Sequence, residues 1–115
     1  MKIKEKQPPR VFEVGDQNKC NLKDCACIQL EANEQVTFRE GYDVVRKSWG
    51  FYATPSTNGR LAKHGLKTVI VRNKKGQAFV LLIEDGKEKD FQDYAKKESF
   101  TIVGWLNTDE SVHSL

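Results

Sequence analysis

The sequence lacks several features that would assign it to a familiar class of protein. In its 115 residues no window approaches the roughly 18 consecutive apolar residues that a membrane-spanning helix requires. The first residues alternate charged with single apolar side chains, so they lack the continuous hydrophobic region of a secretory signal. The length suits one domain. We therefore expect a soluble, cytoplasmic, single-domain protein with no membrane contact.

Sequence patterns of common enzymes are also missing. The chain has no Walker-type phosphate loop, no dinucleotide-binding glycine pattern and no G-x-S-x-G turn. It has only two histidines, His64 and His113, so few pairs of nucleophile and base can be formed. Asp43 and Glu84 could act as paired carboxylates only if the fold brought them together. An enzyme is therefore the least favoured function.

Cysteine is scarce, and its spacing does not match the common metal sites. Cys20, Cys25 and Cys27 form C-x4-C-x-C, which lacks the paired C-x2-C of most structural zinc sites. His64 or His113 would complete a tetrahedral set only if the fold placed it nearby. A disulfide from Cys20 to either other cysteine is sterically conceivable. We expect reduced thiols and no metal or other cofactor, because cytoplasmic chains rarely keep disulfides.

The most informative scarcity is that of acidic residues in the middle of the chain. No Asp or Glu lies between Asp43 and Glu84. The basic residues of that interval are Arg46, Lys47, Arg60, Lys63, Lys67, Arg72, Lys74 and Lys75. The net charge of +3 is too small to indicate nucleic acid by itself, and the residues after Asp90 reverse the sign. This segregation suits an anion-binding side, although lysine and arginine that merely face solvent on strands would give the same pattern.

Short strands are predicted for the first half of the chain. Residues 1–9 are polar and end in two prolines, which favour a flexible, extended lead-in, so the ordered domain is expected over residues 10–106. Short β-prone runs occupy residues 11–14 and 27–30. A hairpin is predicted at Gly41, because glycine supplies the positive φ that a tight turn needs.

The second half contains the clearer elements. Residues 68–71 and 78–83 predict a β-hairpin, and the second run should be a central strand because its apolar residues do not alternate. Residues 87–98 show helical spacing, with acids at the start and lysines at the end. A strand over 100–106 and a polar tail over 107–115 follow. The expected fold is therefore α+β, a mainly antiparallel sheet of short strands with one packed helix, ending strand, strand, helix, strand.

The candidate binding segment runs from Tyr42 to Leu61. It combines aromatic rings that can stack on a sugar or base, arginines that can bind an anion in a bidentate manner, and turn residues that present polar groups. The candidate ligand-binding residues are Arg46, Lys47, Trp49, Tyr52, Asn58 and Arg60. Alternatively, the aromatic residues would pack in the core, and the arginines would pair with Asp43 or Glu40.

Three strings of the sequence resemble a family of small uncharacterised bacterial proteins. They are PPRVFEV at residues 8–14, EQVTF at residues 34–38 and the whole of residues 42–61. Together they span most of the expected ordered chain. That family is associated with gene groups for surface-polysaccharide biosynthesis, so the resemblance implies a carbohydrate-related partner. It implies no catalytic residue, and residues 20–27, which hold the cysteines, depart from the pattern.

Three functions from different classes follow. The leading one is a non-catalytic binding or accessory module for an anionic partner such as a sugar phosphate, a nucleotide-sugar or an acidic glycan. The alternative is a protein–protein interaction or regulatory subunit, a homodimer included, that uses the surface of Trp49, Phe51 and Tyr52. Binding of single-stranded nucleic acid by the basic hairpin is disfavoured, because its strands lack the aromatic-rich pattern of such sheets.

Overall fold

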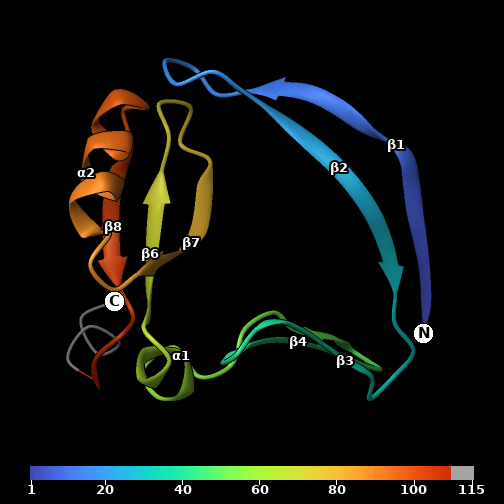
Figure 1. Ribbon diagram of the computed structural model, residues 1–115. Coiled ribbons are helices and arrows are strands. Elements are labelled where there is room, and N and C mark those ends of the chain that lie inside the picture. The colour runs from blue at the N-terminus through green and yellow to red at the C-terminus, as the bar shows by residue number, and fades with distance from the viewer. Residues whose placement is uncertain (110–115) are drawn as a thin grey trace.

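The computed structural model describes residues 1–109 and arranges them in three antiparallel sheets and two helices (Figure 1). The elements of the N-terminal half are β1 (Lys2–Val14), β2 (Cys20–Gln29), β3 (Gln35–Arg39), β4 (Tyr42–Lys47) and β5 (Gly50–Tyr52). The elements that follow are α1 (Arg60–Lys63), β6 (Leu66–Arg72), β7 (Ala78–Glu84), α2 (Glu88–Lys97) and β8 (Thr101–Trp105). The predicted α+β class with a mainly antiparallel sheet is confirmed.

The hydrophobic core lies between α2 and the sheet β7–β6–β8. Val69 and Val71 of β6 are fully buried and pack against Phe91 and Ala95, which are four residues apart on α2. That spacing places both side chains on one face of the helix. Acidic residues in the first turn of α2 and lysines in its last turn complement the helix dipole. The sequence pattern and the packing of this helix therefore agree.

The prediction that residues 78–83 form a central strand is wrong. β6 is the central strand, and β7 lies at the edge. Phe79 and Val80 of β7 are exposed, Val80 by 61%. The uninterrupted apolar run of β7 puts apolar side chains on both faces of the sheet, but α2 covers only one of them. The other face stays open within a single chain.

The first two strands form a long ribbon in which no residue is buried. The expected flexible lead-in over residues 1–9 is also corrected, because β1 begins at Lys2 and Lys2 to Glu5 pair with the end of β2. The register shifts between Glu5 and Arg10, where the two prolines lie, so the ladder omits the positions that lack an N–H donor. Pairing with a distant strand thus orders a segment whose local composition favours disorder.

The tip of the ribbon contacts the end of α2, which gives the chain the outline of an open ring (Figure 1). The backbone N–H groups of Asp16 and Gln17 each donate to Glu98 Oε2 at 3.0 Å. Glu98 is buried and directly follows α2. Lys74, between β6 and β7, donates to Asp16 Oδ2 at 3.3 Å. The buried carboxylate is therefore satisfied by backbone donors from a segment more than 80 residues away in sequence.

Neither α1 nor α2 is long and apolar enough to cross a membrane. Of the polar tail predicted from residue 107, only residues 107–109 fall within the described part, and the rest lies outside it.

An ion pair between β6 and α2 provides a pH-dependent test of this packing. Lys67 Nζ lies 3.0 Å from Glu88 Oε1, and this hydrogen bond raises the pKa of Lys67 and lowers the pKa of Glu88. The lowered carboxyl pKa makes the stabilisation fully present above the unfolded value of 4.5, and it is lost as the pH falls through the folded pKa. The raised pKa of Lys67 means that its own contribution persists below 10.5 and is lost only as the pH rises through its folded pKa.

We expect the Lys67→Met substitution to lower the melting temperature at pH 7 and to have a smaller effect in acid, once the pH has fallen through the lowered pKa of Glu88. Thermal unfolding of both proteins at both pH values measures this difference. Lys89→Met is the matched control, because Lys89 is almost fully exposed and only contacts Asp93 at 3.5 Å. Equal losses of melting temperature at the two pH values would contradict the stabilising role of the ion pair between Lys67 and Glu88.

Candidate functional site

The small sheet β3–β4–β5 carries most of the predicted binding residues, but on two opposite faces. In its register, Val45 pairs with both Gln35 and Tyr52, whereas Arg46 pairs with Phe51. Successive residues of a strand point to opposite sides, so Tyr52 and Arg46 cannot share a face. The predicted group of residues is therefore split by the alternation of the strands.

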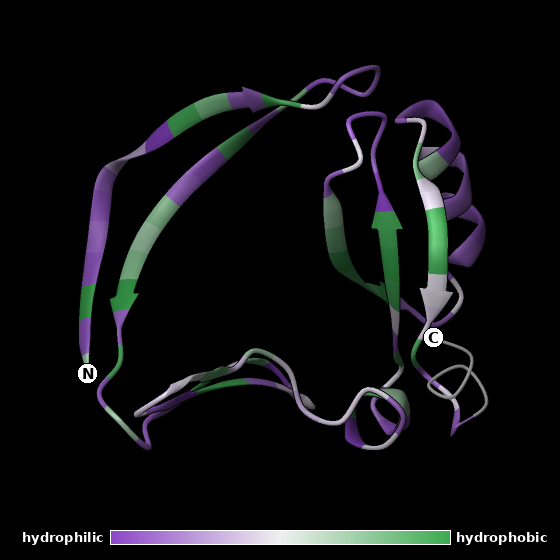
Figure 2. Ribbon diagram, turned by 180° about the vertical axis from the view of Figure 1, so that it is seen from behind, coloured by the Kyte–Doolittle hydropathy of each residue, from purple (hydrophilic) through white to green (hydrophobic). Residues whose placement is uncertain are grey.

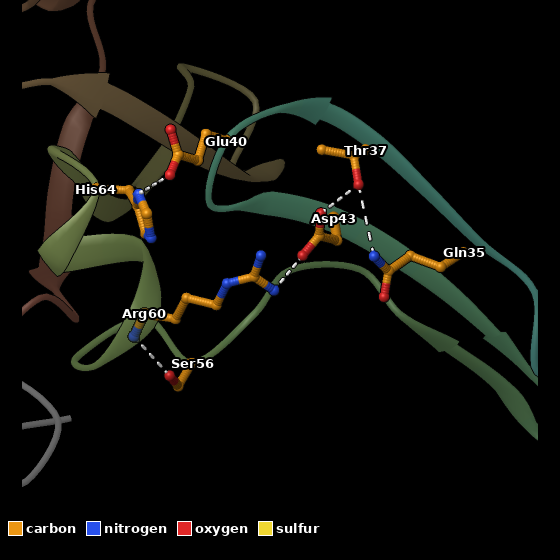
Figure 3. Close-up of polar contacts among 7 residues, drawn as sticks. All are labelled: Gln35, Thr37, Glu40, Asp43, Ser56, Arg60 and His64. Carbon is orange, nitrogen blue, oxygen red and sulfur yellow. Dashed lines mark hydrogen bonds and ion pairs between the residues drawn. The ribbon is translucent and has the colours of Figure 1, made fainter.

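The face of Tyr52 contains a network of polar side chains (Figure 3). The carboxylate of Asp43 is buried; Thr37 Oγ1 donates to its Oδ1 at 2.6 Å, and the guanidinium of Arg60 binds its Oδ2. Ser56 Oγ accepts a hydrogen bond from the backbone N–H of Arg60 at 2.8 Å, at the start of α1. Gln35 donates to Thr37 at 3.5 Å. The alternative prediction that an arginine pairs with Asp43 is confirmed for Arg60.

A shallow pocket of about 160 Å³ lies beside this network. Its polar and aromatic lining comes from Gln35, Asp43, Tyr52, Thr54, Ser56 and Arg60. The side chain of Arg60 remains half exposed although Asp43 is buried, so part of the guanidinium faces solvent. The pocket therefore combines a phenol ring, a guanidinium and neutral hydrogen-bonding groups.

An aromatic ridge flanks the pocket. Trp49, in the turn between β4 and β5, packs edge-on against Tyr52 with ring centroids 5.5 Å apart. The exposed fractions of Trp49, Phe51 and Tyr52 are 67%, 54% and 57%. The alternative prediction that these aromatic residues pack in the core is therefore wrong. Phe51 and Tyr52 lie on β5, which is only three residues long, and Trp49 lies in the turn before it.

Arg46 and Lys47 are held by contacts within the chain. Arg46 Nη1 donates to the carbonyl oxygen of Gly50 at 2.9 Å, and its guanidinium lies 4.9 Å from the centre of the Phe51 ring. Lys47 Nζ donates to Asn33 Oδ1 at 2.7 Å. In the described part of the chain neither cation has a carboxylate partner, so both keep an uncompensated positive charge.

The face of Arg46 has a second, larger pocket, of about 360 Å³. Its apolar lining includes Val36, Phe38, Val44 and Phe51 from the sheet, together with Ile28 and Leu30 from the segment that enters it. This face is therefore mainly hydrophobic, whereas the face of Tyr52 is polar.

Asn58 does not join either face. Its Nδ2 donates to Asp109 Oδ1 at 2.8 Å, and Asn58 does not line the polar pocket. The structure thus brings together Tyr52 and Arg60, with Trp49 at the rim. Lys47 lies on the same side of the sheet by alternation but does not line the pocket, whereas Arg46 and Asn58 are separated from it. Sequence reasoning missed Gln35 and Thr37; they alternate along β3 and could have been found by placing Asp43 opposite Thr37 in the predicted hairpin.

The cysteines and His64 lie on different elements of the fold. Cys20, Cys25 and Cys27 are all free and exposed on β2. His64 follows α1, with Nδ1 3.9 Å from Glu40 Oε1. Within residues 1–109 no three side chains of the metal-binding types gather into a cluster. His113 lies outside the described residues.

Comparison of the chain with protein-family models, with curated proteins and with solved structures finds no match in any of the three.

Proposed function

We propose that the protein is a non-catalytic binding module whose ligand is a saccharide that carries negative charge, such as a sugar phosphate, a nucleotide-sugar or an acidic glycan. The observation that carries this proposal is the convergence of Tyr52, Arg60 and neutral hydrogen-bonding groups in one pocket. Aromatic rings pack on the apolar faces of sugars, and hydroxyl and amide groups bind the sugar hydroxyls. Trp49 extends the aromatic surface beyond the pocket.

The size of the pocket limits what it can hold. Its volume of about 160 Å³ is below the roughly 300 Å³ of sites that enclose a drug-sized molecule. It therefore suits a single sugar ring or a terminal group of a longer glycan, with the remainder of the ligand lying along the exposed ridge of Trp49.

The charge of the sheet supports an anionic ligand. Asp43 compensates Arg60, but Arg46 and Lys47 have no carboxylate partner among the described residues. These two cations would attract an anion over several ångströms. Because exposed charges are screened by salt, binding should weaken as the ionic strength rises.

We expect Tyr52→Ala and Trp49→Ala each to weaken saccharide binding. Aromatic stacking contributes roughly 1–3 kcal/mol per ring, so the dissociation constant should rise about five- to 160-fold. Thermal shifts against sugar phosphates, nucleotide-sugars and acidic oligosaccharides would find the ligand, and calorimetric titration would measure it. A ligand at a hundred times its dissociation constant stabilises the fold by about 2.7 kcal/mol.

The control for these variants is Phe38→Ala, which removes an exposed aromatic ring at the other pocket. Arg60→Ala is a poor probe of binding, because it also leaves the buried carboxylate of Asp43 without its cation. Ligand affinity that does not change in Tyr52→Ala, or the absence of any thermal shift across the panel, would refute the proposal.

A second candidate function is a protein–protein interaction or regulatory subunit. The specific support for it is that Trp49, Phe51 and Tyr52 are all more than half exposed on one small sheet, with Arg46 packed on the ring of Phe51. Trp, Tyr and Arg are the residues that most often dominate protein interfaces. Association that resists salt and is lost in Phe51→Ala but not in Tyr52→Ala would favour this function over saccharide binding.

A further inference from the structure

The ribbon β1–β2 has too little packing within its own chain to account for its order. Residues 1–40 include no buried residue. A two-stranded ribbon is marginally stable in water by itself, and ordering each backbone residue costs about 1–2 kcal/mol. Hydrogen bonds of its tip to Glu98 hold one end, and an ion pair between the Met1 amino group and Glu34, at 2.9 Å, holds the other, but neither contact covers its length. Something else must therefore cover the length of the ribbon.

The area and dimensions of the chain indicate how much surface is left uncovered. Its accessible surface is 8380 Å², whereas a compact monomer of 13.2 kDa exposes about 6,400 Å². The radius of gyration is 15.9 Å, against roughly 13 Å for a compact domain of this length. The excess of about 2,000 Å² lies within the roughly 1,000–2,500 Å² that each protomer of an obligate dimer buries.

A complementary surface exists on the C-terminal sheet. In the register of β6 and β7, Ile70 pairs with Val80 and Thr68 pairs with Leu82, while Val69 and its neighbours face α2. Alternation therefore places Ile70, Val80 and Leu82 on the face that α2 leaves open. Apolar residues run along both β6 and β7 in Figure 2. Thr68, at the end of this face nearest α1, is fully buried, whereas Ile70 and Leu82 are partly exposed and Val80 is exposed, so the open part is an apolar strip about one strand pair wide.

The ribbon has apolar side chains that could fill this strip. Phe12 pairs with Leu22 and Ile3 pairs with Ile28, so each pair lies on one face of the ribbon. Leu22, Ile3 and Ile28 are all exposed. Figure 2 shows apolar bands along the ribbon, separated by hydrophilic ones. The ribbon and the open sheet face thus have matching apolar surfaces.

A two-fold axis would make the contact between ribbon and open sheet face twice, once in each direction.

We propose that the occupant of the open sheet face is a second copy of this chain, and that the protein is a two-fold homodimer in which each ribbon packs on the β7–β6–β8 sheet of the other copy. The ribbon is long enough to lie along the facing sheet because β1 contains 13 residues and β7 contains 7. The dimer covers the two surfaces that a single chain leaves exposed, and it leaves the polar pocket of Tyr52 free.

Light scattering and sedimentation of the full chain at micromolar concentration test this proposal. The expected mass is twice that of the 13.2 kDa chain. Val80→Lys and, separately, Leu22→Lys should raise the dissociation constant of the dimer at least about a hundredfold, because each would bury an unpaired charge. Both side chains are exposed in the single chain, so the substitutions leave the monomer core intact.

Ser48→Lys is the control, since it places the same charge on an exposed residue of the turn between β4 and β5 and should leave the dimer unchanged. Hydrogen exchange of β1 and β2 gives a second measurement, in which protection should rise with protein concentration. The proposal would be overturned if the wild-type protein stayed monomeric at about 100 times the micromolar concentration used first. It would also be overturned if the dimer tolerated both Val80→Lys and Leu22→Lys. Saccharide binding measured on these monomeric variants tests the polar pocket separately.

Discussion

Replacing Phe91 with alanine is expected to lower the free energy of unfolding by about 3–5 kcal/mol. Phe91 is 7% exposed and joins α2 to β6 through its contacts with Val69 and Val71. Its ring also packs edge-on against Trp105, with centroids 5.9 Å apart. Because this cluster forms the core of the described chain, the cavity left by the ring has few neighbours that could collapse into it.

Urea denaturation followed by tryptophan fluorescence would measure this loss. Phe38→Ala is the matched control, because it removes the same ring from a position that is 60% exposed, and a change of about 1 kcal/mol or less is expected there. Similar losses in Phe91→Ala and Phe38→Ala would show that α2 does not organise the core.

The second large effect is expected at Gly41, in the turn between β3 and β4. Its φ is +86°, a conformation that costs a residue with a side chain roughly 1–2 kcal/mol. A Cβ at Gly41 would also lie 2.4 Å from Cβ and Cγ of His64, so the turn could no longer rest on the end of α1. Overpacking adds about 1–3 kcal/mol, and Gly41→Ala should therefore cost about 2–5 kcal/mol.

Gly86→Ala separates the cost of the positive φ from the cost of the clash with His64. Gly86 has a φ of +87°, but no atom lies within 4 Å of a Cβ built on it. It should therefore show the backbone penalty alone, about 1–2 kcal/mol. Denaturation curves of both variants measure the difference. If Gly41→Ala were no more destabilising than Gly86→Ala, the contact between the turn and His64 would have no energetic weight.

Local signals in the sequence predicted the elements that depend on nearby residues. The helix over residues 87–98 could be identified from apolar spacing and from the charges at its ends, and α2 spans Glu88–Lys97. The turn at Gly41 could be identified because few other residues adopt a positive φ. Each of these features is decided by interactions over a few residues, so the sequence is sufficient for them.

Features that depend on distant partners were predicted less well. An apolar run such as residues 78–83 is compatible with a central or an edge strand, and β8 decides the matter by pairing with β6. Likewise, residues 1–9 are polar and rich in proline, but they join β1 because β2 offers a partner. Composition reports local preference, whereas strand pairing is a property of segments far apart in the chain.

The candidate site also combines features set by nearby residues with features set by distant ones. The sequence by itself determined that the segment from Tyr42 to Leu61 would be basic, aromatic and rich in turns, because these are properties of its composition. Only the tertiary structure decided that Arg60 binds the buried carboxylate of Asp43 and that Asn58 bonds to Asp109, 51 residues away. Strand alternation and contacts over long sequence separations set the position of each side chain, and neither can be derived from residue types alone.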